Sequence, residues 1–422
     1  MQAADPAPSA AAERGTLSLA PLLDAVVERN PNLVALDEDR AAALDRAVAA
    51  GSMPHPVLGF AVRNLPVDTF SFSEDMMTMK EIMVRQQFPW FGKRKLRREV
   101  VEQNAAVAAA ERAAQALALQ QATAEAYANL WFSSASVDIV QQQEQALRRF
   151  AAIARARYAA GGGSQSDLLR ADVELARIRE PLLDLEAMRD TSRAALATLL
   201  SGSLDELRGA PAAPPLPELP ADPEALFAAV GAHPELKALA EQAERSEIEA
   251  RLAERDRWPD PEIGVMYGVR NDVDGMDVPD MVGAEIMFRI PVFASSKENR
   301  LAAAARSEGR ATNSRRQGRA DQLLGEARGA YAAARQQREL MRLYDEEILP
   351  RARRNLESAT GSYQAGTVDF LTLLDAQVQL QTQQLEALRA RANYVRHVAR
   401  LSRATGVSLF RDSHAASEVT RG

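Results

Sequence analysis

Four short segments of the chain alternate between apolar and polar residues with a period of two. In MKEIMVRQQ (79–87), Ile82 and Val84 share one face of an extended chain. The opposite face carries Glu81, Met83, Arg85 and Gln87. The same alternation occurs in PVLGFAVR (56–63), EIGVMYGVR (262–270) and MVGAEIMFRI (281–290). The pattern predicts four β-strands with one continuously apolar face and one face that carries Glu and Arg.

Helical periodicity dominates the rest of the chain, in long stretches rich in Ala, Gln, Glu and Arg. Each half is expected to contain an opening helix, a long helix and a return helix: 19–52, 93–158 and 167–200, then 222–257, 297–363 and 369–405. At about 1.5 Å per residue the long helices would run about 100 Å, roughly twice the length of their return helices. One long rod is therefore expected to lie antiparallel to two shorter rods stacked end to end. A dimeric coiled coil is the alternative, but the Ala-rich faces favour broad, side-by-side packing.

Glycine and proline mark where these helices turn or bend. Gly161–Gly163 and Gly366 are expected to form the turns between long and return helices. Pro350 should bend the second long helix, and the first long helix has no equivalent proline.

The chain repeats itself. EIMVR (81–85) recurs 204 residues later as EIMFR (285–289), and AYA recurs at 126–128 and 330–332. Pro31 in the first half matches Pro234 in the second, within similar stretches of helix. Ordered matches at offsets between 202 and 205 indicate a tandem duplication, joined at APAAPPLPELPADP (210–223), a stiff linker.

Composition narrows the functional classes. Apolar residues make up 46% and charged residues 26% of the 422 residues, so wholesale disorder is not expected. A net charge of −7 without a dominant basic face gives little support to nucleic-acid binding. The lack of cysteine excludes disulfides, thiolate metal sites and cysteine nucleophiles. No run approaches the roughly 18 consecutive apolar residues of a membrane-spanning helix. The chain is therefore either soluble or crosses a membrane as strands.

The strand faces favour the membrane alternative. An apolar outer face and a polar inner face are typical of a transmembrane barrel, and about 9–11 residues per strand span a bilayer. Four strands cannot close a barrel, and open edges are not tolerated in lipid, so several copies must each contribute four strands. The charged residues of the repeated motifs EIMVR and EIMFR are then expected to face the barrel lumen: Glu81, Arg85, Glu285 and Arg289. The alternative is a soluble coiled-coil scaffold whose sheet packs on its own helices.

Together these features resemble the TolC family of outer-membrane channel proteins. The resemblance covers residues 18–407 and rests on the duplicated helix–strand–strand–helix–helix plan and on FPWFGK (88–93) at a strand-to-helix junction. It also rests on two hairpin tips, YAAGGGSQSDLLRA (158–171) and YQAGTVDFLTLLDA (363–376). Within the family, QQFPWFGKRK (86–95) is most similar to outer-membrane members of heavy-metal exporters of the resistance–nodulation–division type.

The resemblance implies a mainly α fold with a small β part. Each protomer of a homotrimer would supply four transmembrane strands to a 12-stranded barrel and its long antiparallel helices to an α-helical barrel. The trimer would sit in the outer membrane of a Gram-negative bacterium, with a long periplasmic extension that meets a periplasmic adaptor protein and, through it, an inner-membrane pump. It would act without a cofactor or a reaction, as the exit duct of a tripartite efflux system for metal cations or small toxic compounds. An exit duct for type I protein secretion is the alternative within the same fold.

The expected domain organisation follows the repeat. It comprises a flexible mature N-terminus behind an added Met (1–17), repeat 1 (18–205), a Pro-rich equatorial linker (206–223), repeat 2 (224–407) and a C-terminal tail (408–422).

The hairpin tips are the candidate functional site. The resemblance places Asp375 where the family has a pore-narrowing aspartate, with Thr372 in place of a second aspartate and Val368 in place of a gating arginine. Asp375 could instead be an interhelical ion-pair partner, and Asp167 and Asp369 are interpreted as N-cap or first-turn residues. Tyr158 and Tyr363 are expected to pack across the hairpins. The residues expected to contact the adaptor are Tyr158, Gly161, Gly162, Gly163, Ser164, Gln165, Ser166, Tyr363, Gly366 and Thr367.

The sequence contains no set of catalytic residues or metal ligands at a recognised spacing. The four histidines, at 55, 233, 397 and 414, are far apart in the predicted layout. Thioethers suit Cu(I) and Ag(I), which makes Met76, Met77 and Met79 the candidate metal ligands, although barrel packing or loop filling is the favoured explanation. An enzymatic function is not expected.

Overall fold

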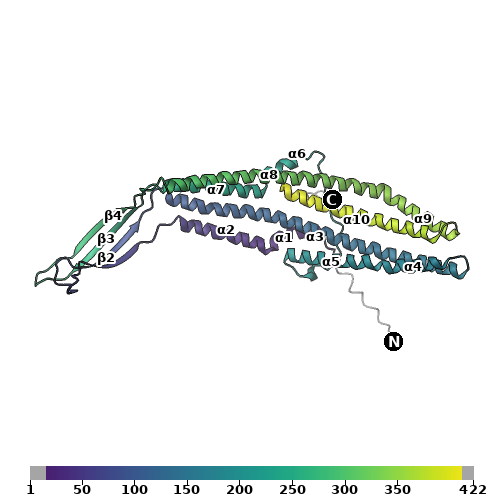
Figure 1. Ribbon diagram of the computed structural model, residues 1–422, viewed down its shortest axis with the longest axis horizontal. Helices are drawn as coiled ribbons and strands as arrows, with labels where there is room; N and C mark the ends of the chain where they lie inside the picture. The colour runs from purple at the N-terminus through teal and green to yellow at the C-terminus, as the bar shows by residue number, and fades with distance from the viewer. Residues whose placement is uncertain (1–15, 411–422) are drawn as a thin grey trace, which may run out of the picture. The chain divides into compact units, whose positions relative to one another are not determined.

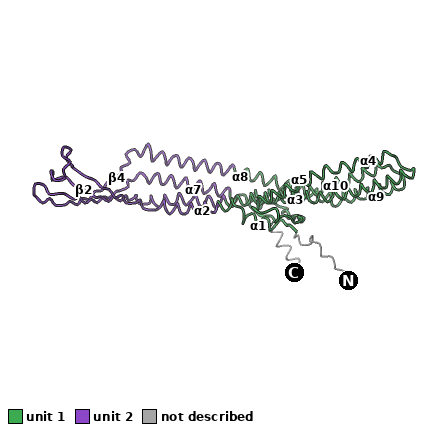
Figure 2. The backbone as a smooth tube through the Cα atoms, turned by 90° about the horizontal axis from the view of Figure 1, so that it is seen from below, with its two compact units in different colours: residues 1–35, 112–234, 319–422 green, residues 36–111, 235–318 purple. Residues whose placement is uncertain are grey.

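A computed structural model of the chain describes residues 16–410 and confirms a mainly helical fold with one small sheet. Most of the expected N-terminal segment and C-terminal tail, and His414, lie outside these residues. The described residues form two compact units (Figure 2). Unit 2 takes residues 36–111 and 235–318, and unit 1 takes the remainder. The unit boundaries fall within or at the start of helices, so four helices contribute residues to both units.

Unit 2 holds the sheet and the helical segments next to it in the chain (Figure 1). Its elements are most of α2 (Pro31–Ala50), β1 (Val57–Arg63), β2 (Met79–Gln87), the start of α3 (Lys93–Ala159), α7 (Pro234–Arg255), β3 (Pro261–Arg270), β4 (Met281–Phe288) and the start of α8 (Glu298–Leu343). The four strands pair antiparallel in chain order, β1-β2-β3-β4, so the β2–β3 pair joins the two repeats. The predicted strands are therefore confirmed, and each repeat contributes two of them.

Unit 1 is helical. Its elements are α1 (Leu19–Arg29), the rest of α3, α4 (Gln165–Arg177), α5 (Arg179–Leu200), η1 (Leu204–Leu207), α6 (Glu224–Ala228), η2 (Ala229–Ala232), the rest of α8, η3 (Tyr344–Ile348), α9 (Leu349–Ala365) and α10 (Phe370–Thr405). Helices α3 and α4 form one antiparallel hairpin, and α9 and α10 form another (Figure 1). Among the helices of residues 16–410, none combines the length and the apolar character that a bilayer-spanning helix needs.

Three expected helices are interrupted, each time within three residues of a proline. The opening helices break at Asn30 and at His233, which are extended because a residue before proline is sterically disfavoured in the helical region. The first return helix breaks at Ile178, where Pro181 cannot donate the backbone hydrogen bond that would continue the helix. Where the sequence predicts a bend at Pro350, the helix contains a π-helical turn, η3, which ends two residues before that proline.

The proline-rich linker is held in place by tyrosines of unit 1. The Tyr127 hydroxyl lies 2.8 Å from the carbonyl oxygens of Leu17 and Ala212, and a bridge pairs Leu17 with Pro211. The Tyr331 hydroxyl donates to the carbonyl of Pro220 at 2.7 Å. Tyr127 and Tyr331 are the central residues of the repeated AYA motif, so equivalent residues of the two repeats anchor opposite ends of the linker.

Candidate functional site

The two hairpin tips in unit 1 begin and end at residues suited to sharp turns. Gly161 and Gly366 adopt positive φ angles of 77° and 79°, which favour glycine because a side chain is strained there. Ser164 caps α4 by accepting a hydrogen bond from the backbone amide of Ser166. Asp369 caps α10 by accepting hydrogen bonds from the amide and hydroxyl of Thr372, which hold the Asp369 pKa below its usual range. The sequence-based interpretation of both aspartates is confirmed, because Asp369 is the N-cap of α10 and Asp167 lies in the first turn of α4.

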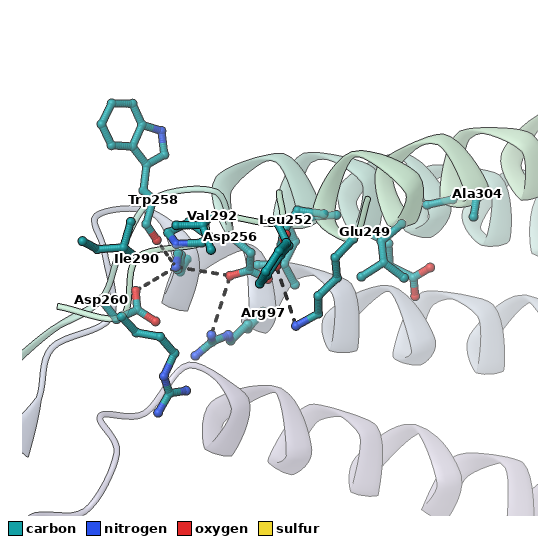
Figure 3. Close-up of a pocket in the computed structure, with 18 of the residues that line it drawn as sticks. Arg97, Glu249, Leu252, Asp256, Trp258, Asp260, Ile290, Val292 and Ala304 are labelled. Carbon is teal, nitrogen blue, oxygen red and sulfur yellow. Dashed lines mark hydrogen bonds and ion pairs between the residues drawn. The ribbon is translucent and has the colours of Figure 1, made fainter. Parts of the chain in front are cut away.

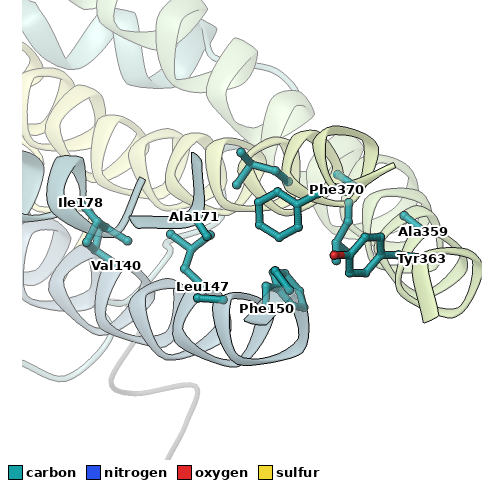
Figure 4. Close-up of a cluster of buried hydrophobic side chains, with 13 residues drawn as sticks. Val140, Leu147, Phe150, Ala171, Ile178, Ala359, Tyr363 and Phe370 are labelled. Carbon is teal, nitrogen blue, oxygen red and sulfur yellow. The ribbon is translucent and has the colours of Figure 1, made fainter. Parts of the chain in front are cut away.

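A hydrophobic cluster joins the two hairpins behind their tips (Figure 4). Phe150 and Ala154 of α3 pack with Ala171 of α4 in the same cluster as Tyr363 and Phe370 of the other hairpin. The Tyr363 and Phe370 rings meet edge to face with their centroids 5.7 Å apart. The four helices are therefore packed as one body near the tips.

Arg157 links the tips directly. Its guanidinium donates a 2.7 Å hydrogen bond to the carbonyl oxygen of Tyr363 and lies 4.8 Å from the centre of the Tyr363 ring. It also lies 3.4 Å from the carbonyl oxygen of Gly162, within its own hairpin. Sequence reasoning missed this residue, because one arginine in an Arg-rich helix carries no local signal of its partner in the other repeat.

The candidate constriction residues have different surroundings. Asp375 is exposed on α10, and its carboxylate makes no ion pair with any residue from 16 to 410. Thr372 is engaged in the helix cap, and Val368 packs against the tip cluster. Of the three, Asp375 is the one whose charged group is presented to solvent.

Most residues expected to contact an adaptor are exposed at the tips. Tyr158, Gly161, Ser164, Gln165, Ser166, Gly366 and Thr367 are exposed, as is Gly162, and Gly163 is half-buried. Tyr363 is the exception, with only 3% of its surface exposed. Tyr363 therefore packs across its hairpin against Phe370 of α10, as expected, whereas Tyr158 is exposed and does not.

In unit 2, strand pairing places the apolar residues of all four strands on one face. Phe60, Ile82, Tyr267 and Val282 form one row across the sheet, and Leu58, Val84, Val265 and Ala284 form the next. These side chains are exposed, with Phe60 and Val282 both at 73%. The sheet therefore does not pack this face on the helices of its own unit, which argues against the soluble scaffold alternative.

The opposite face of the sheet carries charged residues of the repeated motifs EIMVR and EIMFR. Glu285 of β4 accepts a 2.8 Å hydrogen bond from Arg85 of β2, across the intervening strand β3. Gly264 of β3 permits this pair, since a Cβ at this position would lie 2.8 Å from the Glu285 side chain. Glu81 is buried on the same face and pairs with Arg63 of β1. Arg289 follows the end of β4 and lines a cavity near the junction of sheet and helices.

That junction is organised around Lys93, the last residue of FPWFGK. Its ammonium is buried and lies 2.7 Å from the Trp258 carbonyl, 2.8 Å from Asp260 and 3.4 Å from Asp256. Figure 3 labels these three partners. The Trp90 ring stacks on Trp258 with centroids 5.4 Å apart. Burial alone would raise the pKa of Asp260, but the Lys93 ammonium and the Trp90 amide outweigh it and hold that pKa below its usual range.

A cavity of about 690 Å³ lies beside Lys93 (Figure 3). Its walls combine acidic, basic and apolar side chains, among them Glu249, Arg97, Ile290 and Val292. FPWFGK thus fixes the turn from β2 into α3, a role that the sequence alone did not assign to Lys93.

The candidate metal ligands do not share one environment. Met76 and Met77 are exposed, whereas Met79 is buried against Gly268. Within residues 16–410, no group of three or more His, Asp or Glu side chains is arranged to hold a metal ion.

The sequence matches a family model described as outer membrane efflux protein, over residues 22–202 and 228–407. The chain belongs to this family. The two matched ranges coincide with the two halves of the chain, which confirms the tandem repeat. The protein is thus identified as an outer-membrane efflux channel protein, and its sheet and hairpin tips are the surfaces to consider for that function.

Solved structures of outer-membrane efflux proteins and channels share this fold. CusC, described in connection with transmembrane channel formation, matches with a TM-score of 0.77 and 16% identity, over 94% of this chain and 93% of that chain. The outer-membrane channel OprN matches with a TM-score of 0.75 and 18% identity, over 93% and 90% of the two chains. VceC, an outer membrane protein of Vibrio cholerae, matches with a TM-score of 0.75 and 18% identity, over 93% and 96%. A comparison with curated protein sequences finds no match.

Proposed function

We propose that this protein is the exit duct of a tripartite efflux system and that it works as a homotrimer. Its task is to conduct small cargo passively from a periplasmic adaptor and an inner-membrane pump to the outside of a Gram-negative cell. Metal cations or small toxic compounds are the proposed cargo.

The observation that carries this proposal is the chemistry of the two sheet faces. Rows of exposed apolar side chains, such as Phe60–Ile82–Tyr267–Val282, suit contact with lipid. The other face, with its Arg85–Glu285 pair, suits a wet lumen. Strands β1 and β4 are open edges, and edges in lipid must be paired, so further copies of the chain are needed to close the ring.

The tips are proposed as the periplasmic end of the duct. Tyr158 and the exposed residues from 161 to 166 would meet the adaptor together with Gly366 and Thr367. Three copies of Asp375 would place a ring of carboxylates at the narrow end, which attracts cations. The absence of an ion-pair partner for Asp375 within residues 16–410 supports this role, because an unpaired exposed carboxylate can act on passing ions.

The experiment is single-channel recording in planar bilayers. Wild-type protein should insert as a trimer and pass current with a preference for cations. Asp375→Ala should reduce that preference, while Asp172→Ala, which removes an exposed aspartate paired with Arg155 on the first hairpin, should leave it unchanged. No current from the wild type would contradict the duct, and unchanged selectivity in Asp375→Ala would remove Asp375 from the constriction.

A further inference from the structure

All five methionines of the four strands lie on the polar face of the sheet. The strand register places them on the same side as Glu81 and Glu285. These residues, which we call the thioether face, are Met79, Met83, Met266, Met281 and Met287. The apolar face of the same strands contains no methionine.

This segregation is not what a space-filling role predicts. Methionine is an adaptable apolar side chain, and as a filler it would serve best among the Val, Ile, Leu and Phe residues of the exposed apolar face. On the face with the charged residues, Met281 and Met287 are exposed and Met83 and Met266 are half-buried, so water-borne solutes can reach these four, whereas Met79 is buried. The property that distinguishes methionine from those residues is its sulfur, a soft ligand.

Glycines on neighbouring strands make room for three of these methionine side chains. The Met79 sulfur lies 2.8 Å from the position that a Cβ on Gly268 would occupy. The Met83 and Met266 sulfurs each lie 3.3 Å from the corresponding positions on Gly59 and Gly283. A side chain on any of these glycines would displace a thioether, so the sheet is built to accommodate them.

Two of these methionines line a small cavity. Met83 and Met266 are directly opposite each other in the β2–β3 pair, and both line a cavity of about 40 Å³ together with Glu81 and Glu285. The two carboxylates are already paired with Arg63 and Arg85. The cavity therefore offers neutral sulfur ligands in a setting whose charges are balanced, which disfavours hard divalent cations and suits a soft monovalent one.

We propose that Met83 and Met266 bind a soft monovalent metal cation, Cu(I) or Ag(I), in this cavity. Met79 and Met281 lie on the same face near Gly268, where Gly268 is paired with Met281, and offer a second position for the ion. The thioether face thus forms a series of weak sites along the wall of the sheet. The inference rests on the proposed function in one respect, that this face lines the conducting path, and it narrows the cargo of that path to soft cations.

Silver ion is the probe, because Ag(I) does not change oxidation state in air. Titration calorimetry of the full chain, purified in detergent, should detect Ag(I) binding, and Met83→Leu/Met266→Leu should weaken it by about tenfold or more. Leucine conserves volume, so folding should be kept. Met188→Leu, which changes an exposed methionine of α5, is the matched control and should bind as the wild type does.

A second measurement needs no variant. Mild peroxide oxidation followed by mass spectrometry should show that Ag(I) protects Met83 and Met266 from sulfoxide formation, while Met188 is oxidised at the same rate with and without the metal. Equal Ag(I) affinity of the double variant and the wild type, or equal oxidation of Met83 and Met266 with and without Ag(I), would overturn the proposal. Potassium conductance separates the two hypotheses: a conducting protein that does not bind Ag(I) refutes only this inference, and a protein that binds Ag(I) but does not conduct refutes the duct.

Discussion

Arg157 joins the two repeats at their tips by a hydrogen bond to the Tyr363 carbonyl oxygen, 2.7 Å long, and by its position over the Tyr363 ring. Tyr363 is itself buried against Phe370. The arginine therefore connects the turn of the first hairpin to the packed core of the second. Separation of the two hairpins at their tips would break this connection.

Replacing Arg157 by leucine should loosen the tips. The variant loses a charge-assisted hydrogen bond and a cation–π contact, together worth about 1–3 kcal/mol in local stability. Hydrogen–deuterium exchange of residues 158–166 and 363–369 should become several-fold faster. Arg148→Leu is the control, because within residues 16–410 Arg148 forms an ion pair with Glu144 of its own helix and with no residue of the other hairpin. Unchanged exchange at the tips of Arg157→Leu would show that the contact does not restrain them.

Lys93→Met should destabilise unit 2 by roughly 3 kcal/mol, because it leaves the Asp260 carboxylate and the Trp258 carbonyl without their buried cation. Lys95→Met is a matched control two residues away. Lys95 is exposed and pairs with Glu99 within the same helix, so its removal should cost less than about 0.5 kcal/mol. Chemical unfolding followed by tryptophan fluorescence would report both, since Trp90 and Trp258 stack beside Lys93. Equal midpoints for the two variants would contradict the structural role of Lys93.

The linker anchor can be tested by removing one oxygen atom. Tyr127→Phe loses the hydroxyl that contacts Leu17 and Ala212, and should lower the free energy of unfolding by about 1–2 kcal/mol. Burial raises the pKa of the Tyr127 phenol to about 12, in keeping with an enclosed neutral hydroxyl. Tyr331→Phe removes a single, exposed hydrogen bond to Pro220 and should cost less. A larger loss of thermal stability in Tyr331→Phe than in Tyr127→Phe would contradict the expectation that Tyr127 is the stronger anchor of the linker.

Stability should fall in mildly acidic solution because of His397. Burial, together with the nearby Arg400 and Arg396, lowers the pKa of His397 below its ordinary value, and Glu125 offsets this in part. The unfolded chain therefore binds a proton at His397 more readily than the folded chain does. The neutral His397 side chain contributes to the stability of the folded state above about pH 6.5, and this contribution is lost as the pH falls through the folded-state pKa. The difference in thermal midpoint between wild type and His397→Gln should change between pH 7.5 and 5.5. An exposed histidine, replaced in His55→Gln, should show no such change.

Much of this protein follows from its sequence alone. The strands, their two faces and the turns at Gly161 and Gly366 follow from residue periodicity and from the backbone preferences of glycine, which act over a few neighbouring residues. The tandem repeat is likewise a property of the sequence. The helix breaks at Asn30 and His233 could also have been read locally, since each precedes a proline.

Only the tertiary structure decided which distant residues meet. Arg157 with Tyr363, Lys93 with Asp260, and Met83 with Met266 each join positions from different repeats. The register of β2 on β3 and the packing of one hairpin on the other bring these residues together. Neither can be predicted from the pattern of neighbouring residues. Periodicity assigns a side chain to a face, but its partner on that face depends on how the two halves of the chain pack.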